Sequence, residues 1–352
     1  MLGKPVARAP GSDLFEVDLK GRKRVVDVSL REVEDHWMSL PAAKIVVTER
    51  FEPSAIETLR AVGQVVELDR PDEATLLSAV RDADAVVVRT YTRITKQVIE
   101  AAPRLRVIGR GGVGVDNIDI EAAKERGIVV VYTPAAATDA VADLAVGLMI
   151  SVLRKINAGD QFIRQGRFFD ARESSVSREM SGLTLGIVGM GRIGRAVARR
   201  CHLGFNMRVV YNDIVDPGWL ETAVTPVPLM ELLSEADVVS LHVPLTDATR
   251  GMINAASLAR CKRNAILINT ARGQVVDSDA LASALFRGEL GGAGLDVTDP
   301  EPLPVDHPLL ALPQVVVTPH IGARTVVGLA RMNAVVEDVV RVLRGKPAEY
   351  AL

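Results

Sequence analysis

The sequence is poor in cysteine and in aromatic residues, and its charges nearly cancel. Its two cysteines, Cys201 and Cys261, give no disulfide framework and lack the spacing of a metal site. A formal net charge of −2 excludes a general attraction to nucleic acid or to an anionic membrane surface. No apolar run reaches the about 18 residues of a membrane span, and the first residues lack a signal-peptide pattern. These absences predict a cytoplasmic protein that binds neither nucleic acid nor membrane.

Aliphatic residues, by contrast, are abundant. Apolar residues make up 48% of the 352 residues, and aromatic residues only 4%. This composition suits buried parallel strands that are covered by helices on both faces. The length allows two domains.

The most informative stretch runs from Leu185 to Asp213. A short apolar run precedes Gly189, Gly191 and Gly194, which are spaced as G-x-G-x-x-G, and a helical pattern and a second apolar run follow. Such glycines allow a tight turn, a close approach to a pyrophosphate and close helix–strand packing, and the helix start offers N–H groups to phosphate. An acid at Asp213 would bind a ribose diol and repel a 2′-phosphate, which favours NAD over NADP. An ordinary glycine turn, with Asp213 as a turn-capping residue, is the alternative.

From Lys44 onward, short apolar runs alternate with helical patterns. This order predicts an α/β fold with two Rossmann-like, doubly wound parallel sheets. One long helix is expected from Asp139 to Gln165, with Thr138 as its N-cap and a polar connector over residues 167–178. A last helix is expected from about Val326 to Leu343.

The glycine motif begins far from the N-terminus, which predicts a cofactor domain inserted into a substrate domain. We expect the substrate (catalytic) domain to comprise residues 43–138 and 323–352, and the NAD-binding domain to comprise residues 139–322. Hinges are expected near residues 137–140 and 322–325, with the site in the cleft between the domains. Residues 1–42 form an extension, in which alternating apolar residues on both sides of Lys20-Gly21 predict a β-hairpin.

Three side chains suited to catalysis follow expected strands of the second half. The guanidinium of Arg272 can bind a carboxylate through two parallel hydrogen bonds, although a surface arginine is the alternative. His320 can give a proton to a carbonyl oxygen, and His242, which also ends a strand, is its rival. Glu301 would stabilise the imidazolium of His320, or else be an ordinary loop carboxylate.

A second glycine-rich loop, Gly111 to Gly114, precedes Asp116 and Asn117. It lacks the helix start of a G-x-G-x-x-G motif. Its backbone N–H groups could hold a substrate carboxylate, and a plain tight turn is the alternative.

These motifs together carry a family resemblance. From about Lys44 to its last residue, the chain resembles the NAD(P)-dependent D-2-hydroxyacid dehydrogenases, and it is most similar to the glyoxylate/hydroxypyruvate reductases among them. The matching segments are GRGGVGVDNID (109–119), GIVGMGRIGRAVA (186–198), NTARGQVVD (269–277), GLDVTDPEPLP (294–304) and TPHIGA (318–323).

The resemblance implies a role for each candidate residue. Arg272 would bind the 2-oxo acid, and His320, paired with Glu301, would be the acid in reduction and the base in oxidation. NAD would be the cofactor, and a homodimer would form through the cofactor domains. The implied binding residues are Val113 and Gly114 for the substrate carboxylate, Gly189, Gly191, Arg192, Ile193 and Gly194 for the pyrophosphate, Asp213 for the adenosine ribose, and Val243, Thr270 and Asp296 for the nicotinamide side.

The sequence departs from the family pattern in three places. Residues 1–42 lie outside the resemblance. The helix after the glycine motif is one residue longer than usual near Leu203-Gly204, which leaves the register of Asp213 open. The resemblance also includes no regulatory domain of the kind found in long phosphoglycerate dehydrogenases.

We therefore expect an oxidoreductase that transfers a hydride between NAD(H) and a small D-2-hydroxy acid or 2-oxo acid, with glyoxylate/hydroxypyruvate reductase as the leading function. D-3-phosphoglycerate dehydrogenase is a close alternative, in which Arg89, Arg93 and Arg110 would bind the substrate phosphate. An alternative of another class is an NAD(H)-sensing scaffold similar to the C-terminal-binding-protein corepressors, which would bind NADH but turn over 2-oxo acids feebly.

Overall fold

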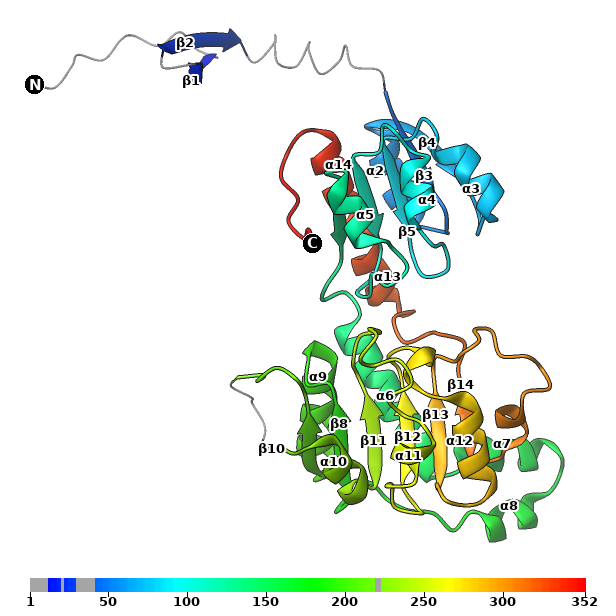
Figure 1. The fold of residues 1–352 in the computed structure, drawn as a ribbon. Coiled ribbons are helices and arrows are strands. Elements are labelled where there is room, and N and C mark those ends of the chain that lie inside the picture. Colours follow the sequence, from blue (N-terminus) through cyan, green and yellow to red (C-terminus); the bar gives the residue numbers. More distant parts are fainter. Residues whose placement is uncertain (1–11, 20–21, 30–41, 219–222) are drawn as a thin grey trace, which may run out of the picture.

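The computed structural model describes residues 12–19, 22–29, 42–218 and 223–352. Two α/β bodies are joined by two chain crossings (Figure 1). Near the N-terminus, β1 (Ser12–Leu19) pairs with β2 (Arg22–Ser29) in an antiparallel hairpin, which confirms the expected strands. The expected turn at residues 20–21 lies outside the described residues.

The first body is built on a five-stranded parallel sheet with the order β4-β3-β5-β6-β7. Helices α2 (Pro53–Arg60) and α14 (Val335–Leu343) pack on one face. Helices α3 (Glu73–Val80), α4 (Lys96–Glu100) and α5 (Ile120–Glu125) pack on the other. The strands are β3 (Ala43–Val47), β4 (Gly63–Glu67), β5 (Ala85–Val88), β6 (Val107–Arg110) and β7 (Val129–Tyr132).

The second body is built on a seven-stranded parallel sheet with the order β10-β9-β8-β11-β12-β13-β14. Helices α6 (Thr138–Leu153) and α9 (Arg192–Arg199) pack on one face. Helices α10 (Leu229–Glu235), α11 (Ala255–Leu258) and α12 (Ser278–Phe286) pack on the other. The strands are β8 (Thr184–Val188), β9 (Arg208–Asn212), β10 (Val224–Pro226), β11 (Val238–Leu241), β12 (Ile266–Asn269), β13 (Gly292–Leu295) and β14 (Val315–Val317).

The chain order confirms the expected fold class, because the second sheet is inserted into the first body. After β7 the chain enters α6, which packs on the seven-stranded sheet. After β14 it enters α13 (Val326–Asn333) and α14, which returns to the five-stranded sheet (Figure 1). The backbone N–H of Leu352 then donates to the carbonyl of Val130 (3.0 Å). The residue limits of the two domains stay a prediction.

The expected long helix over residues 139–165 is wrong in its extent. Lys155 takes a left-handed conformation (φ 54°), which separates α6 from α7 (Ile156–Arg164). Thr138 is the first helical residue and not the N-cap, which is Ala137 without a side-chain hydrogen bond. Part of the expected connector is helical as α8 (Phe168–Ser174), and the expected last helix divides at Ala334.

No helix in the described part of the chain is long and apolar enough to cross a membrane.

Candidate active site

A cavity lined by several of the predicted residues lies where the carboxyl ends of both sheets face each other. Its volume is about 1180 Å³. In open α/β sheets this edge is where ligands bind, at the point where the strand order reverses, here between β8 and β11. The lining includes predicted residues from both bodies, namely Val113, Gly114, Gly191, Arg192, Ile193, Val243, Thr270 and Arg272.

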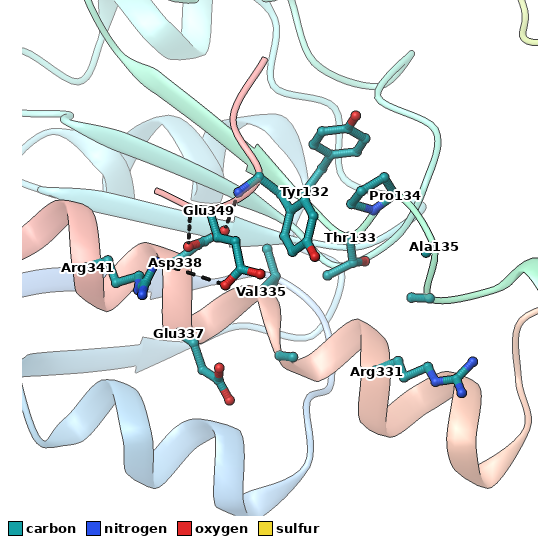
Figure 2. Close-up of a pocket in the computed structure, with 13 residues that line it drawn as sticks. Tyr132, Thr133, Pro134, Ala135, Arg331, Val335, Glu337, Asp338, Arg341 and Glu349 are labelled. Atoms are coloured by element: carbon teal, nitrogen blue, oxygen red, sulfur yellow. Dashed lines mark hydrogen bonds and ion pairs between the residues drawn. The ribbon is translucent and has the colours of Figure 1, made fainter. Parts of the chain in front are cut away.

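A smaller cavity of about 380 Å³ lies between the β7–α6 connection and helices α13 and α14 (Figure 2). It contains none of the predicted site residues. The carboxylate of Asp338 on its wall accepts hydrogen bonds from the backbone N–H groups of Glu349 (2.8 Å) and Tyr350 (2.9 Å). These contacts hold the last residues against α14, so we place the chemistry in the larger cavity.

The glycine motif forms a turn that fits a pyrophosphate. Gly189 has a φ of +96°, and a Cβ at Gly194 would lie 2.1 Å from the Gly189 carbonyl oxygen. Both positions therefore require glycine. Gly191 is the N-cap of α9 without a side-chain hydrogen bond, and a Cβ there would project into open space. The N–H groups of the first turn thus have room for an anion, which is the arrangement that binds the phosphates of a dinucleotide.

Asp213 lies directly after β9, beside the glycine turn. Its carboxylate accepts hydrogen bonds from the N–H groups of Met190 (2.6 Å) and Val215 (3.0 Å). The unusual length before β9 takes the form of a π-helical turn, Arg200–Gly204, which is how a helix accommodates an additional residue. The position fits the expected ribose contact, and the contact itself stays a prediction.

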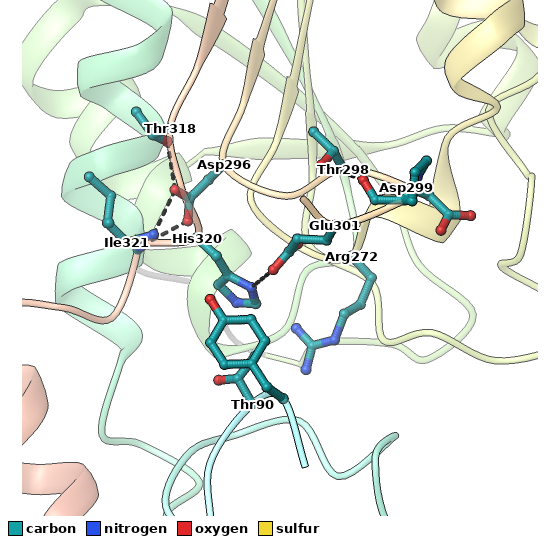
Figure 3. A network of polar contacts seen from close by, with 12 residues as sticks. Thr90, Arg272, Asp296, Thr298, Asp299, Glu301, Thr318, His320 and Ile321 are labelled. Atoms are coloured by element: carbon teal, nitrogen blue, oxygen red, sulfur yellow. Dashed lines mark hydrogen bonds and ion pairs between the residues drawn. The ribbon is translucent and has the colours of Figure 1, made fainter. Parts of the chain in front are cut away.

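His320 and Glu301 face each other at the ends of neighbouring strands (Figure 3). His320 follows β14, Glu301 follows β13, and the Nδ1 of His320 lies 2.7 Å from the Oε1 of Glu301. The two side chains are 23% and 27% exposed, so the pair is accessible from the edge of the sheet. The structure therefore brings together two of the three predicted catalytic residues.

Asp296 holds the loop that carries His320. Its carboxylate accepts hydrogen bonds from the hydroxyl of Thr318 (2.6 Å) and from the N–H groups of Ile321 (2.9 Å) and Gly322 (2.8 Å). The residue is only 2% exposed. Asp296 thus fixes the His320 loop from behind, and its expected contact with the nicotinamide side stays a prediction.

His242, the rival histidine, is among the residues that line the larger cavity, whereas Glu301 and His320 are not. Its Nε2 lies 2.9 Å from the Oγ of Ser240, and its buried Nδ1 has no partner among the described residues. Burial lowers the pKa of His242 to about 3. The ring is therefore neutral near pH 7 and has no carboxylate partner, so it is a poor source of a proton.

Arg272 follows β12 and reaches across to the other body. Its Nε donates to both carboxylate oxygens of Asp116 (3.0 and 3.1 Å), and its Nη2 donates to the Oδ1 (2.8 Å). Nη1 donates to the carbonyl of Ala271 (2.8 Å). A Cβ at Gly114 would lie 1.8 Å from Nη2, so the guanidinium lies directly against the second glycine-rich loop. The sequence singled out this loop but did not predict the Asp116–Arg272 pair.

Two further arginines lie buried at the ends of β5 and β6. Arg89 lies over the ring of Phe51, 4.4 Å from its centroid, and donates to Asn333. Arg110 donates to the carbonyl of Gly111 (3.0 Å). The Nε of each arginine is buried and has no partner in the described ranges. Burial and the nearby charge of Arg272 lower the pKa of Arg110 to about 10, which leaves it charged near pH 7.

The loop after β5 depends on Glu49, which the sequence did not single out. Its carboxylate accepts hydrogen bonds from four successive backbone N–H groups, those of Arg89, Thr90, Tyr91 and Thr92 (3.0 to 3.2 Å). This buried acid fixes the loop that faces His320 in Figure 3. Arg93, further along the same loop, is exposed and does not line the cavity.

Comparison with known proteins points to one family. A family model described as D-isomer specific 2-hydroxyacid dehydrogenase, NAD binding domain, matches residues 146–322. The glyoxylate reductase of Korarchaeum cryptofilum is 44% identical over 281 residues, which cover 78% of this chain and 84% of that protein.

Other relatives carry different names. The D-3-phosphoglycerate dehydrogenase of Methanocaldococcus jannaschii is 41% identical over 310 residues, which cover 87% of this chain but 58% of that longer protein. The crystal structure of NADPH-dependent glyoxylate/hydroxypyruvate reductase from Sinorhizobium meliloti, in complex with NADP and malonate, matches with a TM-score of 0.80 at 32% identity, covering 88% of this chain and 97% of that chain.

Proposed function

Because this chain belongs to the family of D-isomer specific 2-hydroxyacid dehydrogenases and carries its NAD-binding domain, we propose that it reduces a small 2-oxo acid with NADH. Glyoxylate and hydroxypyruvate are the expected substrates. Relatives with the names glyoxylate reductase and hydroxypyruvate reductase, at 44% and 40% identity, support this choice.

The proposed roles follow from the geometry of the strand ends. NADH, when bound along the glycine turn, supplies the hydride for the carbonyl carbon. Arg272 holds the carboxylate and polarises the carbonyl, together with the N–H groups of Val113 and Gly114. The Nε2 of His320 gives a proton to the carbonyl oxygen, while Glu301 at Nδ1 stabilises the imidazolium. In the oxidation direction the same Nε2 accepts the proton.

The observation that carries the proposal is the 2.7 Å contact between His320 and Glu301, which follow the next two strands of the sheet after the one that precedes Arg272. The test is Arg272→Ala, measured as kcat/KM for glyoxylate and hydroxypyruvate. Loss of a charged contact of about 3 kcal/mol lowers kcat/KM by more than about 100-fold. The control is Arg287→Ala, because Arg287 pairs with Glu289 on the surface (2.7 Å). Near-normal kcat/KM in Arg272→Ala would refute the assignment.

D-3-phosphoglycerate is the second candidate substrate, and the buried arginines favour it. Arg89 and Arg110 lie at the ends of adjacent strands, and each has an Nε without a partner in the part of the chain that the structure describes. Arg110 is close enough to Arg272 for their charges to interact. Such a cluster attracts a substrate with a phosphate in addition to its carboxylate. Arg93 is exposed and adds no support.

The two substrate classes are distinguished by comparing 3-phosphohydroxypyruvate with glyoxylate in the wild type and in Arg110→Met. If the phosphorylated acid is the substrate, the variant loses it by more than about tenfold and keeps glyoxylate turnover. No wild-type turnover of 3-phosphohydroxypyruvate removes the second candidate. Tight NADH binding without turnover of any 2-oxo acid would favour an NAD(H)-sensing scaffold.

We also propose a homodimer formed through α7 and α8. No residue of α7 is buried within the chain, although Ile156 and Ile163 on it are apolar. Phe168 and Phe169 on α8 are 55% and 74% exposed. Exposed apolar side chains gathered on two neighbouring helices favour an interaction site. A monomer mass for the wild type in light scattering would contradict the dimer, and Ile163→Asp with Phe169→Asp is expected to produce monomers.

A further inference from the structure

The ion pair between Asp116 and Arg272 joins the two bodies directly at the cavity. The residues are 156 positions apart in the sequence, on the loops after β6 and β12. Their side chains are 33% and 23% exposed, so the pair is partly shielded from water. Two nitrogens of one edge of the guanidinium bind the same carboxylate, which fixes the plane of the guanidinium as well as its position.

The bonding leaves the rest of the guanidinium available for a ligand. Asp116 takes the Nε edge, and the Ala271 carbonyl takes one N–H of Nη1. One N–H on each terminal nitrogen has no hydrogen-bond partner among the described residues. The Nη2 end of the guanidinium lies against Gly114, where any larger residue would collide with it. The guanidinium is thus oriented toward the backbone that is expected to bind the substrate carboxylate.

Asp116 also interacts with two cations. Arg110 and Arg272 repel each other, and the carboxylate of Asp116 attracts both of them. Burial raises the pKa of Asp116, but the hydrogen bonds and charge of Arg272 outweigh burial and lower it overall, so Asp116 is ionised near pH 7. Without this charge, Arg272 would face Arg110 with no partner to fix its orientation, and a long side chain would occupy several rotamers.

We propose that Asp116 is a positioning residue for the reaction, because it fixes Arg272 from the opposite body in the orientation that binds the 2-oxo acid. This inference rests on the proposed function of Arg272. Both bodies then contribute to the active site, because Asp116 of the first body orients Arg272 of the second. Substrate contacts with Arg272 therefore depend on the relative placement of the two bodies.

The test is Asp116→Asn, measured as KM, kcat and the Kd for NADH. Misplacement of a binding group by about 1 Å can cost up to about 100-fold, so we expect kcat/KM to fall by about 10- to 100-fold, mainly through KM. The Kd for NADH should stay within about twofold, because the pair lies apart from the glycine turn. Asp116→Glu, which restores the charge, is expected to recover part of the lost kcat/KM.

A matched control is Asp84→Asn. Asp84 binds Arg104 through the same Nε and Nη2 edge (3.3 and 3.0 Å), but just before β5, at the opposite end of the five-stranded sheet. This variant should lower thermal stability and leave kcat/KM unchanged. Comparison of Asp84→Asn with Asp116→Asn therefore distinguishes the effect of losing a partly buried ion pair from the effect of losing the orientation of Arg272.

The double variant Asp116→Asn with Arg272→Ala decides whether Asp116 acts through Arg272. If it does, the double variant has the same kcat/KM as Arg272→Ala alone. An unchanged or lower KM in Asp116→Asn overturns the proposal, and so does failure of both Asp116 variants to bind NADH. If Arg272→Ala itself has no effect, the proposed function fails instead, which keeps the two results distinct.

Discussion

His320 and His242 follow strands of the same sheet, yet they differ in the partner that matters most for proton transfer. His320, after β14, is bound to Glu301 at 2.7 Å and is partly exposed. His242, after β11, binds the hydroxyl of Ser240, and burial lowers its pKa to about 3. Glu301 gives His320 a carboxylate partner, whereas burial without such a partner favours the neutral ring of His242. A position at the edge of the sheet is therefore not sufficient, and the partner determines which histidine can act as an acid.

The largest effect should come from His320→Gln. Loss of a positioned general acid costs about 100- to 10,000-fold in rate. We expect a fall of that size in kcat for 2-oxo acid reduction, with NADH binding retained. His202→Gln is the control. Within the described residues, the side chain of His202 has one hydrogen-bond contact, between its Nδ1 and the Met207 carbonyl (3.0 Å). A fall in kcat of less than about tenfold in His320→Gln would contradict the assignment of His320, rather than His242, as the general acid.

Glu301→Gln should have the next largest effect. The amide keeps the size of the side chain but cannot stabilise an imidazolium by charge. We expect kcat to fall by about 10- to 100-fold, with a smaller change in the Kd for NADH. A variant as active as the wild type would mean that the 2.7 Å contact does not contribute to catalysis.

Asp213→Asn tests whether the carboxylate that follows β9 selects NADH over NADPH. Removal of the negative charge should raise the ratio of kcat/KM for NADPH to that for NADH by about tenfold. The amide oxygen can still accept the hydrogen bond from Met190 (2.6 Å in the wild type), so the glycine turn is expected to persist. Equal use of NADH and NADPH by the wild type would show that Asp213 is not at the ribose.

The smallest expected effect is that of His242→Gln on the pH dependence of stability. Its pKa is about 3 in the folded chain against an ordinary value of 6.5, so below pH 6.5 the unfolded chain binds a proton that the folded chain does not. This difference lowers the free energy of unfolding by about 2 kcal/mol between neutral pH and pH 5. His242→Gln cannot bind that proton, so its stability should fall less steeply over this range. Parallel curves in urea unfolding from pH 7.5 to 5 would contradict the assignment of a neutral, buried His242.

The sequence predicted the fold and part of the lining of the cavity, because both depend on local patterns. Apolar runs alternating with helical patterns indicate a parallel sheet, and the carboxyl ends of neighbouring strands must meet at one edge. Glu301 and His320 follow neighbouring strands, so their contact could be anticipated.

Features that depend on tertiary contacts were not predicted. The Asp116–Arg272 pair joins loops 156 residues apart, and no spacing rule says which side chains meet between two sheets. The partners of His242 and His320 depend on which side chains meet at the ends of the strands, so sequence position did not distinguish the two histidines. The break between α6 and α7 was not predicted, because the residue in the left-handed conformation is Lys155 and not the glycine that usually marks the end of a helix.

The most direct test of the central claim uses NADH that carries deuterium at C4. Each of the two C4-deuterated epimers is supplied with hydroxypyruvate, and the deuterium content of the product is measured. The account predicts that one of the two epimers gives glycerate of the D configuration with deuterium at C2, and that His320→Gln forms this product at a rate reduced by about 100-fold or more. NADH that binds tightly but transfers no deuterium to any 2-oxo acid, glyoxylate and 3-phosphohydroxypyruvate included, would contradict the assignment of this chain as a 2-hydroxyacid dehydrogenase acting through His320.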